Sequence, residues 1–544
     1  MNKLHEILRQ YKKEVDIINH TFTTQKDNPP IPKGQPPIGG SILWERSLFE
    51  RIKRTIVRFL SLEDMMNCDE GQAVKAHYLR VAKQMKAYED DRYERWRAAT
   101  ESNLPGLLRR TLLTKKEASD TLSVNFAPEL SEIILESKYL EQLGFTIPEL
   151  ARNMSLQEHK YGMFRVGLRN MLERYHRIMH SLNDAELDLL QDHIKQLQQT
   201  LKSGHTRLNW NTLGIKEYVV KCEKMIDKFE SLVNQVHDIA RDISGRIDLI
   251  AMSDYFVYTD TAVPDIKTYF EVVEANRARD IELLARKYRA MGPLLTKLEG
   301  LVVSTNTGRA ERMANYYKHW EKRVYEAVVT AIVDNLTNFN NALKRDQPLF
   351  RIEAALTGSD IVLRPAITEI QKLVLQSLRD AIEGTRSFVR WMDGTCIETP
   401  PQNNPDSDEP YIFTFHSDIL PLPSVTEVCL QIMDNLQKML LNCIRIAARW
   451  RKYKPIWKLD KALVSEKFAN KAPSCIDYDN KLQFYTKLVK DVALINNEEQ
   501  QQAFALDLLP LQSTVKRHAH EWIEQMEMQL NLSVKDRTLN MIPF

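Results

Sequence analysis

The chain has 544 residues and a nearly balanced charge, because 75 Lys and Arg residues stand against 73 Asp and Glu residues, a formal net charge of +2. A near-neutral total creates no global field that would attract nucleic acid or an anionic membrane, so neither is expected as a partner. Charged residues make up 27% and hydrophobic residues 43% of the chain, which excludes wholesale disorder, and the low glycine count of 17 disfavours a turn-rich all-β fold.

An amphipathic helix is predicted from residue 41 to residue 60. Apolar residues recur there at three- and four-residue spacing with charged residues between them. Ser41 is the predicted cap, and the preceding PPIGG is predicted to be non-helical, as part of a rigid, extended lead-in over residues 28–40. If Trp44 is buried against a neighbouring helix, its replacement by alanine is expected to cost about 3–5 kcal/mol.

The same periodicity continues along the chain. It predicts further helices over residues 73–97, 156–182, 216–248, 265–289 and 310–343. The predicted breaks are SNLPG (102–106), the corner between Gly144 and Pro148, and residues 204–214, where Asn211 or Thr212 is the expected cap of the next helix.

The largest composition shift is residues 399–423, which hold six prolines and an acidic run. Within this stretch, residues 411–416 are compatible with one short β-hairpin or edge strand. The expected fold is otherwise all-α, an elongated series of stacked helical bundles. The predicted divisions are an N-terminal helix with its Pro/Gly-rich lead-in (1–40), helical bundles (41–203 and 204–398), a Pro/acidic linker (399–423) and a truncated C-terminal helical bundle (424–544).

The sequence holds no motif for nucleotide binding or hydrolysis. A phosphate-binding loop of the form GxxxxGK[ST] is absent, as are GxGxxG, GxSxG and HExxH. His176 and His180 have the HxxxH spacing that places two imidazoles on one helix face, which makes them weak candidates for a metal site. A polar helix face explains the pair more simply, because a metal also needs a third ligand and a supporting shell. We therefore expect no catalytic residue, metal or cofactor.

Two stretches, PPIGGSILWERSLFERIKR (36–54) and FVRWMDGTCIETPPQ (388–402), resemble segments of the N-terminal tail of dynein heavy chains. Four further stretches resemble the same family in the same order: residues 122–148, 208–213, 298–324 and 348–365. The later ones resemble the axonemal (ciliary) branch more than the cytoplasmic one. The matched motif residues, expected to have structural roles, are Pro37, Gly40, Trp44, Arg46, Leu48, Arg51, Asn125, Phe126, Tyr139, Leu140, Trp210, Gly300, Asn306, Gly308, Trp320 and Trp391.

The resemblance implies a non-catalytic stem of an axonemal dynein heavy chain, a fragment that lacks the ATPase motor. The partners it implies are dynein intermediate chains, light and light-intermediate chains and other heavy chains, with docking on the axonemal doublet through the complex. The location it implies is the cytoplasm and cytoskeleton, in the axoneme of the cilium. A subunit interface is expected on the helices from Leu122 to Leu201, where aromatic and basic residues exceed what one apolar stripe needs.

Three alternatives stand beside this interpretation. An unrelated helical adaptor or tethering rod would keep the bundles, although a spectrin-like rod should show a repeat period and none is found. A cytoplasmic-type dynein tail shares the first motif less closely. A metal-dependent enzyme built on His176 and His180 would contain stoichiometric metal after purification.

Overall fold

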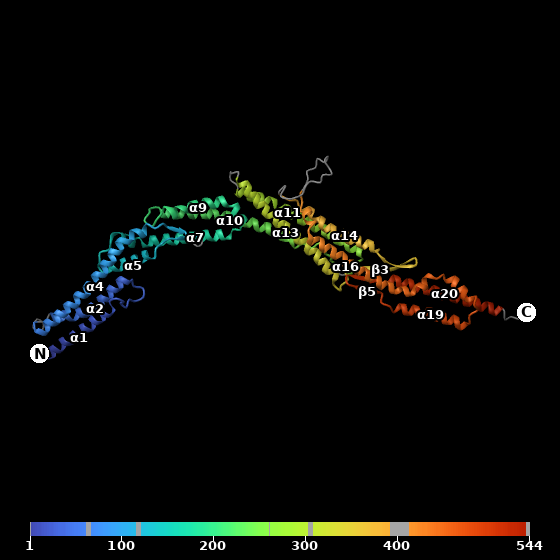
Figure 1. Cartoon of the computed structure of the whole chain (residues 1–544), viewed down its shortest axis with the longest axis horizontal. Helices are drawn as coiled ribbons and strands as arrows, with labels where there is room; N and C mark the ends of the chain where they lie inside the picture. The colour runs from blue at the N-terminus through green and yellow to red at the C-terminus, as the bar shows by residue number, and fades with distance from the viewer. Residues whose placement is uncertain are drawn as a thin grey trace. The chain divides into compact units, whose positions relative to one another are not determined.

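Helices dominate the protein in the computed structural model, which describes residues 2–60, 67–115, 121–260, 262–302, 308–391 and 413–539 (Figure 1). The chain divides into two compact units, Met1–Asn234 and Gln235–Phe544. The all-α prediction is confirmed, with small β elements added to it. None of the helices in these described ranges combines the length and the apolar character needed to cross a membrane.

The first unit consists of helices and one short β-ribbon. Its helices are α1 (Asn2–Gln25), α2 (Pro37–Leu60), α4 (Asp69–Leu108), α5 (Pro128–Gln142), α6 (Glu149–Leu156), α7 (Glu158–Ser181), α8 (Asp184–Leu189), α9 (Gln191–Thr206) and the first part of α10 (Ile215–Ala251). The ribbon pairs β1 (Leu113–Lys115) with β2 (Leu122–Val124) in antiparallel register. Helix α5 packs on α2 and α4, and the ribbon lies against α7 and α9.

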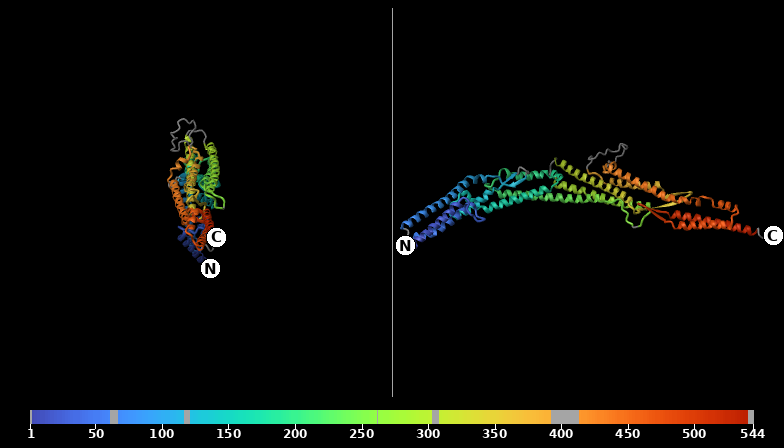
Figure 2. Two further views of the ribbon diagram at one scale, coloured as in Figure 1. Left: turned by 90° about the vertical axis from the view of Figure 1, so that its right-hand side faces the viewer. Right: turned by 60° about the horizontal axis from the view of Figure 1, so that its bottom comes forward.

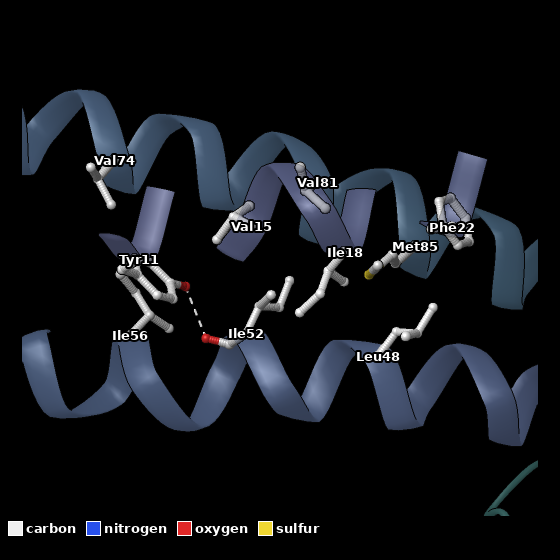
Figure 3. Packing of buried hydrophobic residues seen from close by; sticks show 10 residues of the cluster. All are labelled: Tyr11, Val15, Ile18, Phe22, Leu48, Ile52, Ile56, Val74, Val81 and Met85. Atoms are coloured by element: carbon white, nitrogen blue, oxygen red, sulfur yellow. Dashed lines mark hydrogen bonds between the residues drawn. The ribbon is translucent and has the colours of Figure 1, made fainter. Parts of the chain in front are cut away.

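A three-helix core forms where α1, α2 and α4 pack together (Figure 3). The apolar stripe predicted on residues 42–60 supplies the α2 side of this core, including Leu48, Ile52 and Ile56. Tyr11 adds a polar tie, because its hydroxyl donates to the backbone oxygen of Ile52 at 2.9 Å. The predicted spacing therefore identifies the buried face of α2 correctly.

The second unit contains helices and a small four-stranded sheet. Its helices are α11 (Ile266–Arg289), α12 (Gly292–Val302), α13 (Gly308–Lys344), α14 (Ile367–Glu383), α15 (His416–Ile419), α16 (Pro423–Ala448), α17 (Lys454–Lys458), α18 (Lys461–Ala469), α19 (Cys475–Ala493) and α20 (Leu509–Leu539), with 3-10 turns η1 (Gly384–Ser387) and η2 (Arg449–Tyr453). Helices α13, α14 and α16 pack together, and α19 lies along α20 (Figures 1 and 2).

The sheet of this unit was not predicted from the sequence. Its strand order is β4 (Asp360–Arg364), β3 (Phe350–Thr357), β6 (Phe504–Asp507) and β5 (Glu498–Gln501), with β3 parallel to β6 and the other neighbours antiparallel. Buried and exposed residues alternate along the start of β3, as in a strand with one face in the core. Gly358, at a φ of +65°, makes the tight turn into β4.

Three local predictions are corrected. Helix α2 already begins at Pro37, so IGG is helical, since proline is tolerated in a first helical turn and the free amides of that turn find a partner described below. Helix α4 continues through Pro105 to Leu108 rather than ending at SNLPG. Neither Asn211 nor Thr212 caps α10, because this helix begins at Ile215, after Gly214 at a φ of +92°.

Of the other local predictions, one is confirmed and two concern segments that lie partly outside the described residues. The corner between Gly144 and Pro148 is confirmed, because α5 ends at Gln142 and α6 begins at Glu149. Of the predicted β element at 411–416, residues 411 and 412 lie outside the described ranges, and Thr414 forms a single antiparallel bridge with Val389. Most of the linker predicted over 399–423 also lies outside these ranges.

Candidate functional site

The first motif, PPIGG, forms a junction between α2 and α5. The backbone amides of Ile38 and Gly39 donate to the two carboxylate oxygens of Glu136, at 2.6 and 2.8 Å. Glu136 lies on α5 and is 4% exposed. A carboxylate is stabilised at a helix N-terminus both by the free amides and by the helix dipole. A side chain about 100 residues away therefore caps α2.

Glycine is required at this junction because the two chain segments approach closely. A Cβ atom at Gly39 would lie 2.9 Å from the Cβ of Tyr139, and one at Gly40 would lie 2.5 Å from Cγ2 of Ile31. Both distances are shorter than ordinary van der Waals contact. Gly40 and Tyr139, two of the motif residues, therefore act by allowing or forming close packing.

Arg46 extends the junction to a third helix. Its guanidinium donates to the backbone oxygen of Leu143 at 2.8 Å and to Glu89 of α4 at 2.7 Å. It also lies over the ring of Phe145, 5.4 Å from the centroid. Beside it, Leu140 is fully buried in an apolar cluster that joins α2, α4 and α5. Arg46 and Leu140 thus hold three helices together.

Another buried carboxylate, Glu45 of α2 itself, has a different environment. Glu45 is 2% exposed and Glu89 is 5% exposed. Burial, followed by repulsion from Glu89, raises the pKa of Glu45 to about 8, and the cations Arg46 and Lys86 oppose this shift only in part. Glu45 therefore holds a proton at neutral pH.

The remaining motif residues of α2 lie on different faces. Trp44 is half-buried and stacks on Phe22 with ring centroids 6.0 Å apart. Leu48 lies in the three-helix core, whereas Arg51 is exposed. Pro37 is also exposed and opens the helix. Trp44 therefore contributes less buried area than full burial would give.

Two further motifs meet where β2 faces the turn before α10. The indole nitrogen of Trp210 donates to the backbone oxygen of Asn125 at 2.7 Å. The ring of Phe126 packs edge-on against Trp210 at 4.9 Å, and Arg165 of α7 lies over Phe126 at 5.4 Å. The VNF and LNW motifs, which are distant in sequence, thus form one contact.

The second unit holds the later motifs. Trp391 stacks on Tyr288 with centroids 5.1 Å apart, and the Tyr288 hydroxyl donates to the backbone oxygen of Val389. The adjacent Arg390 is buried between Glu321, at 3.5 Å, and Asp418. This packing ties α11, α13 and α15 to the FVRW motif.

The other predicted residues of this unit are scattered. Trp320 is buried on α13, with Arg323 over its ring at 5.1 Å. Gly300 lies in α12 and a Cβ there would meet open space, while Gly308 is the first residue of α13. Asn306 lies outside the described residues.

His176 and His180 both line a hollow of about 760 Å³ in the first unit, between α7, α9 and the β-ribbon. The side chains that surround it are Lys115, Thr121, Leu122, Tyr175, His176, Met179, His180, Lys195, Gln198, Gln199, Leu201, Lys202, His205 and Thr206. Six of these fourteen are Lys or His, and none is Asp or Glu. Burial, together with His180, lowers the pKa of His176.

The hollow does not have the composition of a metal centre. Within the described ranges, no group of three or more His, Cys, Asp and Glu side chains is arranged to hold a metal ion. A pair of imidazoles beside lysines would hold a cation poorly, because the lysine charges repel it. The same lining suits an anionic group.

The geometry of these motifs agrees with the comparison to known proteins. Residues 1–218 match the family described as dynein heavy chain, N-terminal region 1. The match covers α2 with its cap from α5, the Trp210 contact and the basic hollow. The resemblance to a dynein heavy chain tail is confirmed.

Relatives of this region extend the similarity over almost the entire chain. Dynein axonemal heavy chain 10 of Homo sapiens is 44% identical over 98% of the chain. The dynein-1-alpha heavy chain of the flagellar inner arm I1 complex of Chlamydomonas reinhardtii is 33% identical over 96% of it. The chain spans 12% of the length of each of these relatives. Their names agree with the predicted axonemal location.

Sequence reasoning found the dynein motif residues but missed their partners. Glu136 lies within the quoted stretch 122–148, yet nothing in its local pattern indicates that it caps α2. A glutamate one turn before the apolar Leu140 of α5 is the signal that was available. Lys195 and Lys202 line the hollow beside the predicted histidines. The only sequence signal for this pair is the seven-residue spacing that places both lysines on one face of α9.

Proposed function

We propose that this chain is the non-catalytic tail of an axonemal dynein heavy chain and acts as an assembly scaffold. In this role it binds intermediate chains, light and light-intermediate chains and neighbouring heavy chains, and anchors the motor to the doublet microtubule. The observation that carries the proposal is the 44% identity to an axonemal dynein heavy chain over 98% of the chain.

The arrangement of the motifs supports a structural rather than a chemical role. The residues of PPIGG, VNF, LNW and FVRW make caps, stacked rings and ion pairs between helices. Such contacts fix the relative positions of helices, and rigid helix faces are suited to bind other subunits. The sequence has no phosphate-binding loop beside them.

We place one subunit interface on the helices from Leu122 to Leu201 and keep the proposed divisions at residues 40, 203, 398 and 423. Exposed apolar side chains on this part of the chain include Leu156, Met163 and Val166, which are 75%, 54% and 56% exposed. They stand beside exposed basic residues of α7, and such a mixture is typical of a binding surface.

A pull-down from ciliary extract tests the proposal, with the full chain as bait and mass spectrometry as the readout. We expect dynein intermediate chains, light chains or heavy chains to be enriched over a helical bait of similar size and charge. If a well-folded bait recovers none of them, the scaffold function is wrong for these residues.

A further inference from the structure

The basic hollow between α7, α9 and the β-ribbon has no role among the helix contacts described above. It lies within one unit, and its lining combines cationic and apolar side chains. We propose that this hollow binds an acidic segment of a partner polypeptide, with one apolar side chain of that segment inserted between the cations. The inference rests on the proposed scaffold function and names one docking surface within it.

The charge of the lining is the first argument. Lys195 and Lys202 are exposed on α9, seven residues apart and so on the same face, and His180 faces them from α7. Neither lysine forms an ion pair with any described residue; the amine of Lys195 reaches only the amide oxygen of Gln191, at 3.4 Å. Concentrated cations without carboxylates attract an anionic partner.

A paired arginine on α7 shows that the lack of ion pairs at these two lysines, among the described residues, is local to the hollow. Arg174 lies on α7 only two residues before His176, and its guanidinium is paired with both Asp227 and Glu230 of α10. The side of α7 that faces α10 is thus neutralised by the protein itself. The side that faces α9 is not, within the described lining of the hollow.

A buried polar atom is the second argument. Nε2 of His176 is inaccessible to solvent and has no hydrogen-bond partner among the described residues. Buried polar atoms are nearly always paired in folded proteins, because an unpaired one costs the free energy of its desolvation. A carboxylate that enters the hollow meets the exposed imidazole of His180 directly, and it reaches Nε2 of His176 if that side chain turns toward the occupant.

The floor of the hollow sets the size and kind of the occupant. Tyr175 and Leu201 are buried, and Leu122 and Met179 are half-buried beside them. A volume of about 760 Å³ is far larger than one inorganic anion needs and suits several side chains. A nucleic acid backbone would need a long basic track instead of one local hollow. A short acidic and apolar peptide fits these features best.

Binding of a defined peptide to the full chain tests this inference. The probe is a fluorescein-labelled peptide of three Glu-Glu-Leu-Glu repeats, and the matched peptide has Gln in place of every Glu. We expect the acidic peptide to bind and the neutral one not to bind, as measured by fluorescence anisotropy. The double variant K195Q/K202Q should weaken acidic peptide binding at least about tenfold, because two positive charges that attract the peptide are lost.

A control variant separates the hollow from general charge. K216Q/K224Q removes two exposed lysines of α10 that do not line the hollow, and so changes the net charge equally. This variant should bind the peptide as the unchanged chain does, and circular dichroism should show equal helicity for all three. Equal binding by K195Q/K202Q and the unchanged chain, or an equal loss in both variants, overturns the inference.

The pull-down then separates this inference from the scaffold function. If the unchanged chain recovers dynein subunits and K195Q/K202Q loses one of them, the hollow is a docking surface of the scaffold. If K195Q/K202Q recovers every subunit in the same amount, the hollow is wrong as a docking surface and the scaffold function stands. If no subunit is recovered but the peptide binds as expected, the hollow stands and the scaffold function fails.

Discussion

Helix α2 carries two contrasting carboxylate environments, one at its N-terminus and one two turns later. Glu136 accepts hydrogen bonds from two backbone amides at the start of the helix. Glu45 instead lies beside another buried carboxylate, Glu89 of α4. Both side chains are less than 5% exposed, and burial raises the pKa of both. In the first case the two amide hydrogen bonds oppose the rise, whereas in the second case the like charge adds to it.

The difference shows that burial alone does not decide what a carboxylate does. A carboxylate that accepts hydrogen bonds from the first turn of a helix completes that helix and fixes a joint. A carboxylate beside another one is favoured in its protonated form, because two like charges repel each other. The first environment should therefore be sensitive to substitution, and the second should be sensitive to pH.

Removing the cap should have the largest effect. Glu136→Ala leaves the amides of Ile38 and Gly39 buried without acceptors, so we expect a loss of about 3 kcal/mol in the free energy of unfolding of the first unit. Urea denaturation followed by circular dichroism measures this. Glu132→Ala, at an exposed position one turn earlier on α5, is the control and should cost less than about 0.5 kcal/mol. Equal costs for the two variants would refute the capping role.

Adding a methyl group at the joint should have the next largest effect. Gly39→Ala improves helix propensity by about 1 kcal/mol, yet its Cβ would lie 2.9 Å from the Cβ of Tyr139. We expect overpacking to prevail, with a net loss of about 2 kcal/mol. Gly162→Ala on α7, where a Cβ would meet nothing within 4 Å, should instead be neutral or stabilising. A stabilised Gly39→Ala variant would show that α2 and α5 can separate at no cost.

The Glu45 environment should respond to pH. Its carboxyl has a pKa of about 8 when folded and an ordinary value of 4.5, so its contribution to stability is full below pH 4.5 and is lost as pH rises through 8. Glu45→Gln stays neutral, so its melting temperature should equal that of the unchanged chain near pH 4, and the excess should grow between pH 4.5 and 8 to several degrees at pH 9. A difference independent of pH would contradict the shifted pKa, and Glu94→Gln at an exposed site should show no such trend.

A neutral hydrogen bond provides the smallest effect for comparison. Trp210→Phe keeps most of the ring contact with Phe126 but leaves the backbone oxygen of Asn125 without its indole donor. We expect a cost of about 1 kcal/mol, below that of Glu136→Ala because no charge is involved. Thermal unfolding of both variants in the same buffer gives the order. A larger loss for Trp210→Phe would mean that the LNW contact is the more important joint.

How much could be predicted from the sequence depends on the range of the interaction. The buried face of α2 is encoded in its own three- and four-residue spacing, so Leu48, Ile52 and Ile56 were identified correctly. The start of the same helix was placed four residues too late, because its cap comes from Glu136 on another helix. The residue spacing within one helix cannot reveal a capping side chain that comes from another helix.

The same distinction explains the candidate site and the sheet. The HxxxH spacing correctly placed His176 and His180 on one face, but the lysines that line the same hollow belong to α9 and could not be connected to them from the sequence. The strand β6 is only four residues long, and it pairs with β3 across about 150 residues of sequence. A strand this short has no period of its own to detect.

The parallel pairing of β3 with β6 has a consequence for the chain while it is being synthesised. Phe350 pairs with Phe504, so about 150 residues must be synthesised after β3 before its neighbour exists. At roughly 5–20 residues per second, this is a wait of about 10–30 s. During that time β3 has β4 and the bridge to Asp265 as partners, and the edge that later pairs with β6 is open to strands from neighbouring nascent chains. Slow decoding between these two strands would therefore prolong the period in which the nascent protein is most prone to aggregate.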